Sequence, residues 1–221
     1  MITDITDEQV PAIDASHSSV AQDLIEQEIN NLMAWLPNPA KLSTDEGRGI
    51  IARYAAVLEG NFIYWMSATY LAVRSGEAKA IIEGNLLEEV KDNHPGMLRR
   101  FTLAAQAAPT EVDRSLVDRD LQNVREFVGK LSALEILLMM AFFEGFIAKF
   151  MAYLADLAAE RGSSEMVYTD VHGVCDISHT QGLFSAYEAE LAITKNALPV
   201  EELLGGVNLL RTLIATIIRP K

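Results

Sequence analysis

The amino-acid sequence predicts an all-α fold. Long stretches repeat apolar residues with the 3.6-residue period of a helix, whereas the alternating β-branched runs typical of strands are hard to find. The 13 glycines and 7 prolines are sparse inside these stretches. No repeat, low-complexity tract or linker divides the 221 residues. We therefore expect one helical domain over residues 1–221, which begins with a polar N-terminal lead at 1–17.

The first half of the chain has four segments with helical periodicity, at 19–36, 48–75, 77–90 and 97–107. A segment with two prolines at 36–41 ends the first, and Pro95 can open the fourth because its fixed φ suits the first turn of a helix. Ser43 and Thr44, with Asp45, can cap the second segment, since short polar side chains accept hydrogen bonds from free N–H groups. We expect this second segment to be one long helix.

The second half continues with two helical segments, at 110–131 and 132–160. Gly129 allows a bend or a stop near the end of the former, and the Arg-Gly-Ser-Ser segment at 161–164 ends the latter. Thr169 or Asp170 is expected to cap the next helix, and Pro199 precedes the last one.

The segment at 132–160 is the most apolar part of the chain and contains an unbroken apolar run at 136–143. Crossing a membrane takes about 18 or more apolar residues, and Glu135, Glu144 and Lys149 interrupt this segment. A buried central helix is therefore the better interpretation. A buried Glu144 must be paired, protonated or bound to a metal, because an isolated buried charge is costly. The alternative is that Glu144 lies on an exposed side near Lys149.

The composition excludes several classes of partner. Asp and Glu number 31 against 18 Lys and Arg, which gives a formal charge of -13. Such a surface repels phosphate backbones and anionic membranes, so we expect neither nucleic acid nor a membrane as partner. Cys175 is the only cysteine, so an intrachain disulfide cannot form, and we see no secretory leader at the start of the chain. We expect a cytoplasmic, reducing setting.

His172, Asp176 and His179 lie at positions i, i+4 and i+7, which share one face of a helix. Imidazole and carboxylate together suit a first-row transition metal. Iron is the leading candidate, because two histidines and one carboxylate leave open positions for dioxygen and substrate. The alternative is a polar stripe on an amphipathic helix.

A further group lies at 88–94, where Glu88 and Glu89 precede His94 by six and five residues. Regular helical spacing would not bring either carboxylate to His94, but a distorted helix end before Pro95 could do so. A solvated helix end is the alternative. The chain has only four histidines, of which three belong to these groups, and the fourth, His17, lies in the polar lead. Three histidines and three carboxylates are enough for two metal sites.

The order of these residues resembles the haem-oxygenase-like diiron oxidases and oxygenases, over residues 32–210. The matching features are NLLEE at 85–89, His94, Glu144 in the apolar FFEG segment, and the HxxxDxxH pattern at 172–179. The resemblance implies a seven- to eight-helix bundle and two Fe(II) ions, one of them nearer His94 and Glu144. The implied metal ligands are Glu89 or Glu88, His94, Glu144, His172, Asp176 and His179. Glu89 is favoured over Glu88 because the family's first ligand usually closes an NLxxE stretch, although the segment that follows is shorter here than is common in the family.

Members of that family include fatty acid decarboxylases that make terminal alkenes, N-oxygenases, and cyanobacterial enzymes that turn a brominated tryptophan into an indole-3-carbonitrile. The short segment after Glu89 and the Trp-bearing second helix are most similar to this nitrile-forming group. The resemblance implies an enzyme that uses dioxygen and an external reductant, with Glu144 and Asp176 as catalytic carboxylates. The expected substrate is a small aromatic amino acid; a fatty acid or another amine is the alternative, and a homodimer is left open.

Aromatic side chains on the apolar segments could line a substrate pocket, although such a stripe is more often plain core. The candidates are Tyr54, Phe62, Trp65, Phe142, Phe143, Phe146 and Phe184. Arg53 and Lys149 could anchor a substrate carboxylate or could be ordinary surface charges. Two other classes stay open. A metal-independent, thiaminase-like enzyme would use Cys175 as its nucleophile, and a non-catalytic helical protein would use its acidic surface to bind a partner.

Overall fold

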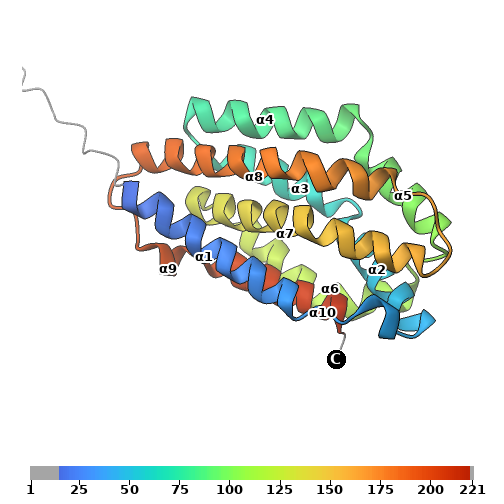
Figure 1. Ribbon diagram of the computed structural model, residues 1–221. Helices are drawn as coiled ribbons and strands as arrows, with labels where there is room; N and C mark the ends of the chain where they lie inside the picture. Colours follow the sequence, from blue (N-terminus) through green and yellow to red (C-terminus); the bar gives the residue numbers. More distant parts are fainter. Residues whose placement is uncertain (1–14, 220–221) are drawn as a thin grey trace, which may run out of the picture.

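The computed structural model describes residues 15–219, and the described part of the chain is helical without any β-strand. The all-α prediction is therefore confirmed (Figure 1). The α-helices are α1 (Ala15–Ala34), α2 (Thr44–Leu58), α3 (Asn61–Ala72), α4 (Gly76–Lys91), α5 (His94–Ala104), α6 (Glu111–Val128), α7 (Ala133–Ala159), α8 (Val167–Ile193), α9 (Val200–Leu203) and α10 (Gly205–Ile218), with a 3₁₀ turn, η1, at Pro39–Lys41. Most of the polar lead predicted at 1–17 lies outside the described residues, and residues 15–17 already belong to α1.

Reciprocal side-chain caps begin two of the helices, and the sequence predicts one of them. Ser43 accepts a hydrogen bond from the Glu46 backbone N–H at 3.3 Å, and the Glu46 carboxylate accepts one from the Ser43 N–H at 2.8 Å. This reciprocal pair satisfies two N–H groups that the start of α2 leaves free. Thr110 and Asp113 form the same arrangement at the start of α6. The prediction that Ser43 caps this helix is confirmed.

Several predicted helix boundaries differ from the structure, and two of the differences have a clear local cause. The single helix expected at 48–75 is divided between α2 and α3, because Gly60 adopts a left-handed conformation with φ of 78° that breaks the run of helical hydrogen bonds. Neither Thr169 nor Asp170 caps α8, which begins earlier, at Val167. Thr169 instead lies inside the first turn of α8 and donates a hydrogen bond to the backbone oxygen of Met166 at 2.9 Å.

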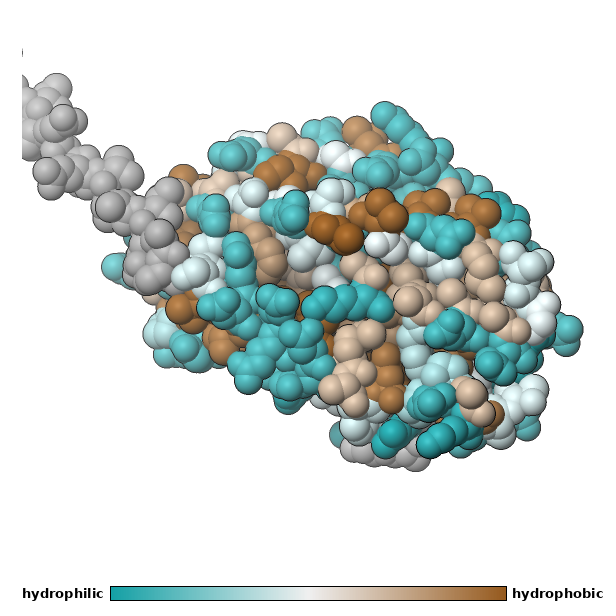
Figure 2. Space-filling model, in the orientation of Figure 1, coloured by the Kyte–Doolittle hydropathy of each residue, from teal (hydrophilic) through white to brown (hydrophobic). Residues whose placement is uncertain are grey.

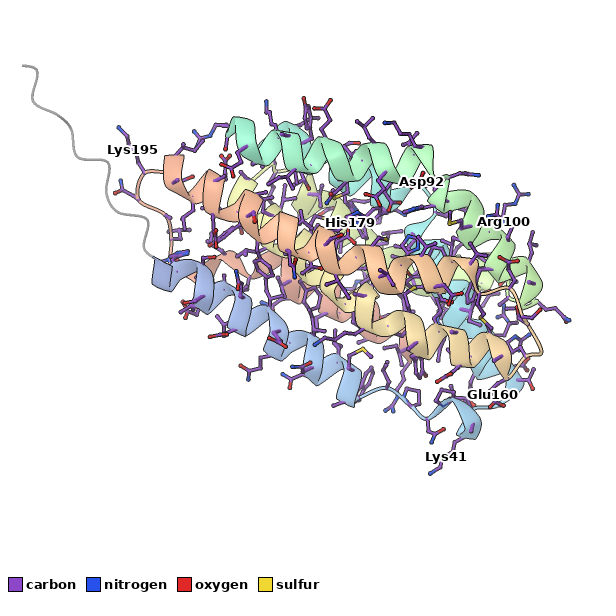
Figure 3. All side chains as sticks on the ribbon, turned by 45° about the horizontal axis from the view of Figure 1, so that its top comes forward. Lys41, Asp92, Arg100, Glu160, His179 and Lys195 are labelled. Carbon is purple, nitrogen blue, oxygen red and sulfur yellow. The ribbon has the colours of Figure 1, made fainter. Side chains whose placement is uncertain are left out.

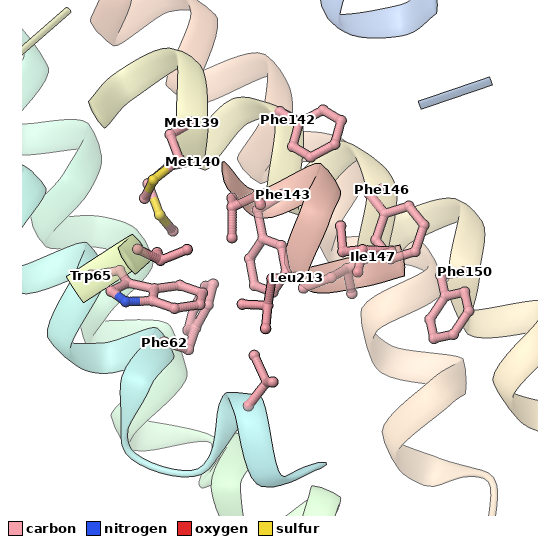
Figure 4. Close-up of a cluster of buried hydrophobic side chains, with 14 of the residues drawn as sticks. Phe62, Trp65, Met139, Met140, Phe142, Phe143, Phe146, Ile147, Phe150 and Leu213 are labelled. Carbon is pink, nitrogen blue, oxygen red and sulfur yellow. The ribbon is translucent and has the colours of Figure 1, made fainter. Parts of the chain in front are cut away.

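Helix α7 forms the centre of the bundle, with α1, α3, α8 and α10 packed around it (Figure 1). It is long and apolar enough to cross a membrane by length and composition, but 83% of its most apolar window is buried inside the protein. Figure 4 shows Phe143 of α7 against Phe62 and Trp65 of α3 in the core. The prediction that this segment is a buried central helix agrees with that burial.

Helix α8 runs beside α7, and α4 covers its other side (Figure 1). The chain turns from α4 into α5 at Asn93, whose φ of 55° is left-handed, a conformation that asparagine tolerates better than most residues. His94 is the first residue of α5 and therefore follows this sharp turn directly. The middle of α8 thus lies between the core helix and the distorted corner that carries His94.

Candidate metal centre

The middle of α8 turns its polar face into the protein. His172, Asp176 and His179 expose 5%, 0% and 4% of their surface, so the helix presents all three on one buried side. Figure 3 shows His179 inside the bundle below α4, whereas labelled charged residues such as Asp92 and Arg100 lie at its outer edge. A solvated polar stripe, the alternative interpretation of this triple, is excluded by that burial.

The first group of side chains, here called the His94 cluster, consists of Glu89, His94 and His172. One potential ligand atom from each of the three lies within 4.8 Å of the others. The left-handed turn before α5 brings His94 Nδ1 to 2.7 Å from Glu89 Oε1, which agrees with the contact expected from a distorted helix end. The His94 and His172 rings meet edge to face at 4.5 Å between centroids.

A backbone contact fixes the tautomer of His172. Its Nδ1 lies 2.9 Å from the Tyr168 carbonyl oxygen, which can only accept, so Nδ1 carries the proton. Nε2 then has a free lone pair, and it points towards Glu89 Oε1 at 4.0 Å. Histidines that bind metals usually donate the other ring N–H in this way.

The second group, here called the Asp176 cluster, consists of Glu144, Asp176 and His179. Its potential ligand atoms also lie within 4.8 Å of one another. His179 Nδ1 is 3.8 Å from Glu144 Oε2 and 3.7 Å from Asp176 Oδ1, distances that are too long for hydrogen bonds. Glu144 is 1% exposed, so the alternative position near Lys149 at the surface is wrong.

The Asp176 cluster leaves one buried polar atom of each member without a hydrogen-bond partner: Glu144 Oε1, Asp176 Oδ2 and His179 Nδ1. Such atoms are rare in folded proteins because each costs free energy when it loses water without gaining a partner. Two carboxylate oxygens and one imidazole nitrogen form a donor set that a divalent first-row metal prefers. The buried Glu and His side chains of the two clusters could therefore hold metal ions.

Burial and like charges change the pKa values of this region. Burial, followed by repulsion from Glu144, raises the pKa of Asp176 to about 9. Burial alone would lower the pKa of His179, but Glu144, Glu88 and Asp176 outweigh it and raise that pKa to about 9. Burial lowers the pKa of His172 to about 4, so this ring is neutral near pH 7. The raised pKa of Asp176 shows that no nearby positive charge outweighs burial and repulsion, and a bound cation would supply that charge.

The two neighbouring glutamates occupy different places. Glu89 is buried in the His94 cluster, whereas the Glu88 side chain is 44% exposed and lies 3.2 Å from His179 Nε2. This geometry agrees with the preference for Glu89 as the ligand. The resemblance implies one iron nearer His94 and Glu144, whereas the side chains that lie within reach of a common ion in the structure are grouped in another way. His94 is grouped with Glu89, and Glu144 is grouped across the site with His179.

A cavity of about 690 Å³ opens on both clusters. Its polar part consists of Glu89, His94, Glu144, His172 and Asp176. Apolar residues of α2, α3 and α5 line much of the rest, with Tyr168, Arg99 and Arg114. None of these last three residues was predicted from the sequence. The helical register of α5 contained a partial signal, because Leu98 and Thr102 follow His94 at i+4 and i+8 and line the same cavity.

Among the aromatic residues predicted to contact a substrate, Phe62 lines the cavity. The other predicted residues do not line it: Tyr54, Trp65, Phe142, Phe143, Phe146 and Phe184. Trp65 and Phe143 are buried against each other edge to face at 5.3 Å, and Phe146 stacks on Phe150 at 4.9 Å. These rings pack the core, which is the commoner fate of an aromatic stripe.

Neither predicted carboxylate anchor borders the cavity. Arg53 is buried and its Nε donates a hydrogen bond to the Ile217 backbone oxygen at 2.8 Å, so it joins α2 to the end of α10. Lys149 is at the surface, where it donates to Asn30 at 2.9 Å. Both positions result from packing between distant helices, which local sequence does not reveal.

Comparisons with protein-family models, with curated proteins and with solved structures give no match to this chain. The resemblance to haem-oxygenase-like diiron proteins therefore depends on the order of the residues along the chain, and it stays a prediction.

Proposed function

We propose that the protein is a dioxygen-dependent diiron oxidase or oxygenase with a haem-oxygenase-like helical bundle. The observation that supports the proposal most directly is the pair of buried clusters facing one cavity, each with histidine and carboxylate ligands. Three carboxylates would neutralise most of the charge of two divalent cations, which a low-polarity interior requires. Two Fe(II) ions held there would supply electrons to dioxygen, and an external reductant would return the iron to the ferrous state.

The protein's own side chains would orient the ligands and handle protons. The Tyr168 carbonyl keeps the Nε2 lone pair of His172 free for ligation. Glu144 and Asp176 are the catalytic carboxylates in this proposal, because both border the cavity and can take a proton from a bound substrate. The apolar walls would exclude water from the reaction.

The substrate in this proposal is a small aromatic amino acid. Volumes of about 300–1,000 Å³ are usual for small-molecule pockets, and this cavity of about 690 Å³ lies in that range. Phe62 and Ile63 offer an apolar wall for a ring, and Arg99 offers a cation for a carboxylate. The reaction proposed is the conversion of a ring-brominated tryptophan to an indole-3-carbonitrile. Oxidative decarboxylation or N-oxygenation of a fatty acid or another amine is the alternative.

Metal content and product analysis test the proposal in two stages. The protein loaded with ferrous iron should hold two irons per chain and consume dioxygen when a reductant and the correct substrate are present. Mass spectrometry should detect a nitrile from dibromotryptophan. This nitrile should form faster than the one from tryptophan, because burial of the bromine atoms should lower the activation free energy by about 1–2 kcal/mol. Turnover of a fatty acid without any nitrile would change the substrate but keep the diiron centre. Failure to bind iron would reject both the diiron centre and the proposed reaction.

Chemistry based on a cysteine nucleophile is disfavoured by the surroundings of Cys175. Burial, followed by repulsion from Asp176, raises the pKa of its thiol far above the ordinary value. The thiol donates a hydrogen bond to Asp176 Oδ1 at 3.2 Å. A nucleophilic cysteine needs the opposite environment, in which nearby positive charge stabilises the thiolate.

A further inference from the structure

His179 has potential metal ligands on both sides of its ring. Nδ1 faces inward to Glu144 and Asp176, whereas Nε2 faces Glu88 at 3.2 Å. Cys175 lies one helical turn before His179, at i-4 on the same helix. A carboxylate oxygen of Glu88, the Cys175 sulfur and a ring nitrogen of His179 lie within 4.8 Å of one another. We call these three residues the outer triad.

The outer triad lies nearer to solvent than the two buried clusters. The Glu88 side chain is 44% exposed, and Cys175 is half-buried. The neighbours of Cys175 along α8, Val174 and Ile177, are 72% and 53% exposed. On the face shown in Figure 2, apolar and hydrophilic side chains are interspersed. A metal from solution can therefore reach this triad without passing through the cavity.

We propose that the outer triad is a binding site for a thiophilic divalent metal ion, such as Zn(II) or Cd(II). Thiolate, imidazole and carboxylate are the three side-chain ligands that zinc uses in proteins, and three of them with one water complete its tetrahedral coordination. The thiolate sets this site apart from the two buried clusters, which offer only nitrogen and oxygen ligands and suit harder metals. The partial exposure of Glu88 leaves room for the water.

Occupation of the outer triad opposes metal binding at the Asp176 cluster. A neutral imidazole has one nitrogen with a free lone pair and one that carries a proton. When Nε2 of His179 binds the outer metal, Nδ1 holds the proton and turns an N–H towards Glu144 and Asp176. The outer site is thus a point at which a thiophilic metal can inhibit the centre. Binding at the outer site itself does not depend on iron or on the proposed function.

Cadmium titration of the metal-free protein tests the proposal, because a cadmium–thiolate bond gives an ultraviolet charge-transfer band that carboxylate or histidine ligation does not. The wild-type protein should develop this band and saturate at one equivalent. Cys175→Ser should show no band, and its hydroxyl can still donate to Asp176. Glu88→Gln should weaken binding by at least about 10-fold, since even outer-shell partners of a metal contribute that much.

Glu83→Gln is the matched control for Glu88→Gln, because Glu83 is an exposed glutamate of the same helix. It should leave cadmium affinity unchanged. His172→Ala, which alters only the His94 cluster, should retain the band. The proposal is overturned if wild type gives no band, or if Glu88→Gln and wild type bind cadmium through the thiol with equal affinity. In the latter case Glu88 would only orient His179, and Cys175 would bind metals without the triad.

Discussion

In the His94 cluster each imidazole has a close hydrogen-bond partner, Glu89 Oε1 for His94 and the Tyr168 carbonyl for His172. In the Asp176 cluster no two members are within hydrogen-bond distance, and each has a buried atom without a partner. The first cluster therefore holds its own geometry through protein contacts. The second places two buried carboxyl groups side by side, so that without a cation Asp176 keeps its proton, and a bound cation would stabilise the ionised carboxylates. Two sites built from the same residue types can thus depend on metal to very different degrees.

The largest expected effects come from removing one ligand of each cluster. We predict that Asp176→Ala and His172→Ala each abolish dioxygen-dependent turnover and lower iron content from two towards one per chain, because each removes a ligand of a different site. Iron analysis by mass spectrometry and dioxygen uptake measure both effects. Full iron content with full activity in both variants would remove these residues from the metal centre.

The next largest effect is expected in the pH dependence of the free energy of unfolding, to which the two clusters contribute differently. Asp176 and His179 keep their protons to about pH 9 when folded, whereas the unfolded chain releases them near pH 4 and pH 6.5. Between pH 6.5 and 9 the folded state binds more protons, so the free energy of unfolding of the metal-free protein falls as pH rises, by about 5 kcal/mol for the two groups together. The ring of His172 is neutral in the folded state throughout this window, and the unfolded ring loses its remaining charge just above pH 6.5, so His172 adds only a small change of opposite sign.

Urea unfolding of the chelator-treated protein at pH 6.5 and pH 9 measures this fall. Asp176→Asn should remove much of it, since the amide does not titrate. Asp156→Asn is the control, because Asp156 is exposed on α7. An equal fall in wild type and Asp176→Asn would show that the Asp176 cluster does not set the dependence.

Glu144→Gln should separate stability from activity. A buried carboxylate without a cation is costly, and burial raises the pKa of Glu144. The amide removes that cost, so the metal-free variant should be folded and more stable than wild type by about 1–3 kcal/mol. Its turnover should vanish. Chemical denaturation and dioxygen uptake measure the two quantities, with Glu126→Gln at an exposed position of α6 as control. Normal turnover by a folded Glu144→Gln protein would contradict a catalytic role.

The smallest effect is expected from removing a hydrogen bond next to the His94 cluster. The Tyr54 and Tyr168 hydroxyls share a buried hydrogen bond of 2.8 Å. Tyr54→Phe removes it and should cost about 1 kcal/mol of unfolding free energy. Iron content should not change, because His172 is oriented by the backbone carbonyl of Tyr168 rather than by its hydroxyl. Loss of iron in this variant would show that the cluster is less self-supporting than its contacts indicate.

The sequence predicted the parts of the site that depend on local geometry. The buried face of α8 follows from the spacing of His172, Asp176 and His179, and the burial of Glu144 follows from the apolar run around it. The contact of His94 with one of the two glutamates was also accessible, because Pro95 indicates an irregular helix end. The helical class followed from periodicity along the whole chain.

The grouping of ligands into clusters could not be predicted from the sequence, because it depends on how α4 and α7 pack against α8. The lining of the cavity was missed for a related reason. Composition does not distinguish an aromatic ring such as Trp65 in the core from one such as Phe62 at a cavity wall. The division at Gly60 had a local signal, but the apolar residues on both sides favoured an unbroken helix.

Because α8 supplies His172 to one cluster and Asp176 to the other, this rigid helix fixes the distance between the two sites. Four residues of α-helix advance about 6 Å along the axis, and this interval is set by backbone geometry rather than by mobile loops. Sliding or tilting of α8 moves both ligands together and preserves their interval. Insertion of a single residue between them would turn one by about 100° away from its partners. Substitutions in the cavity walls on α2, α3 and α5 can therefore change the shape of the cavity while the distance between the sites stays constant.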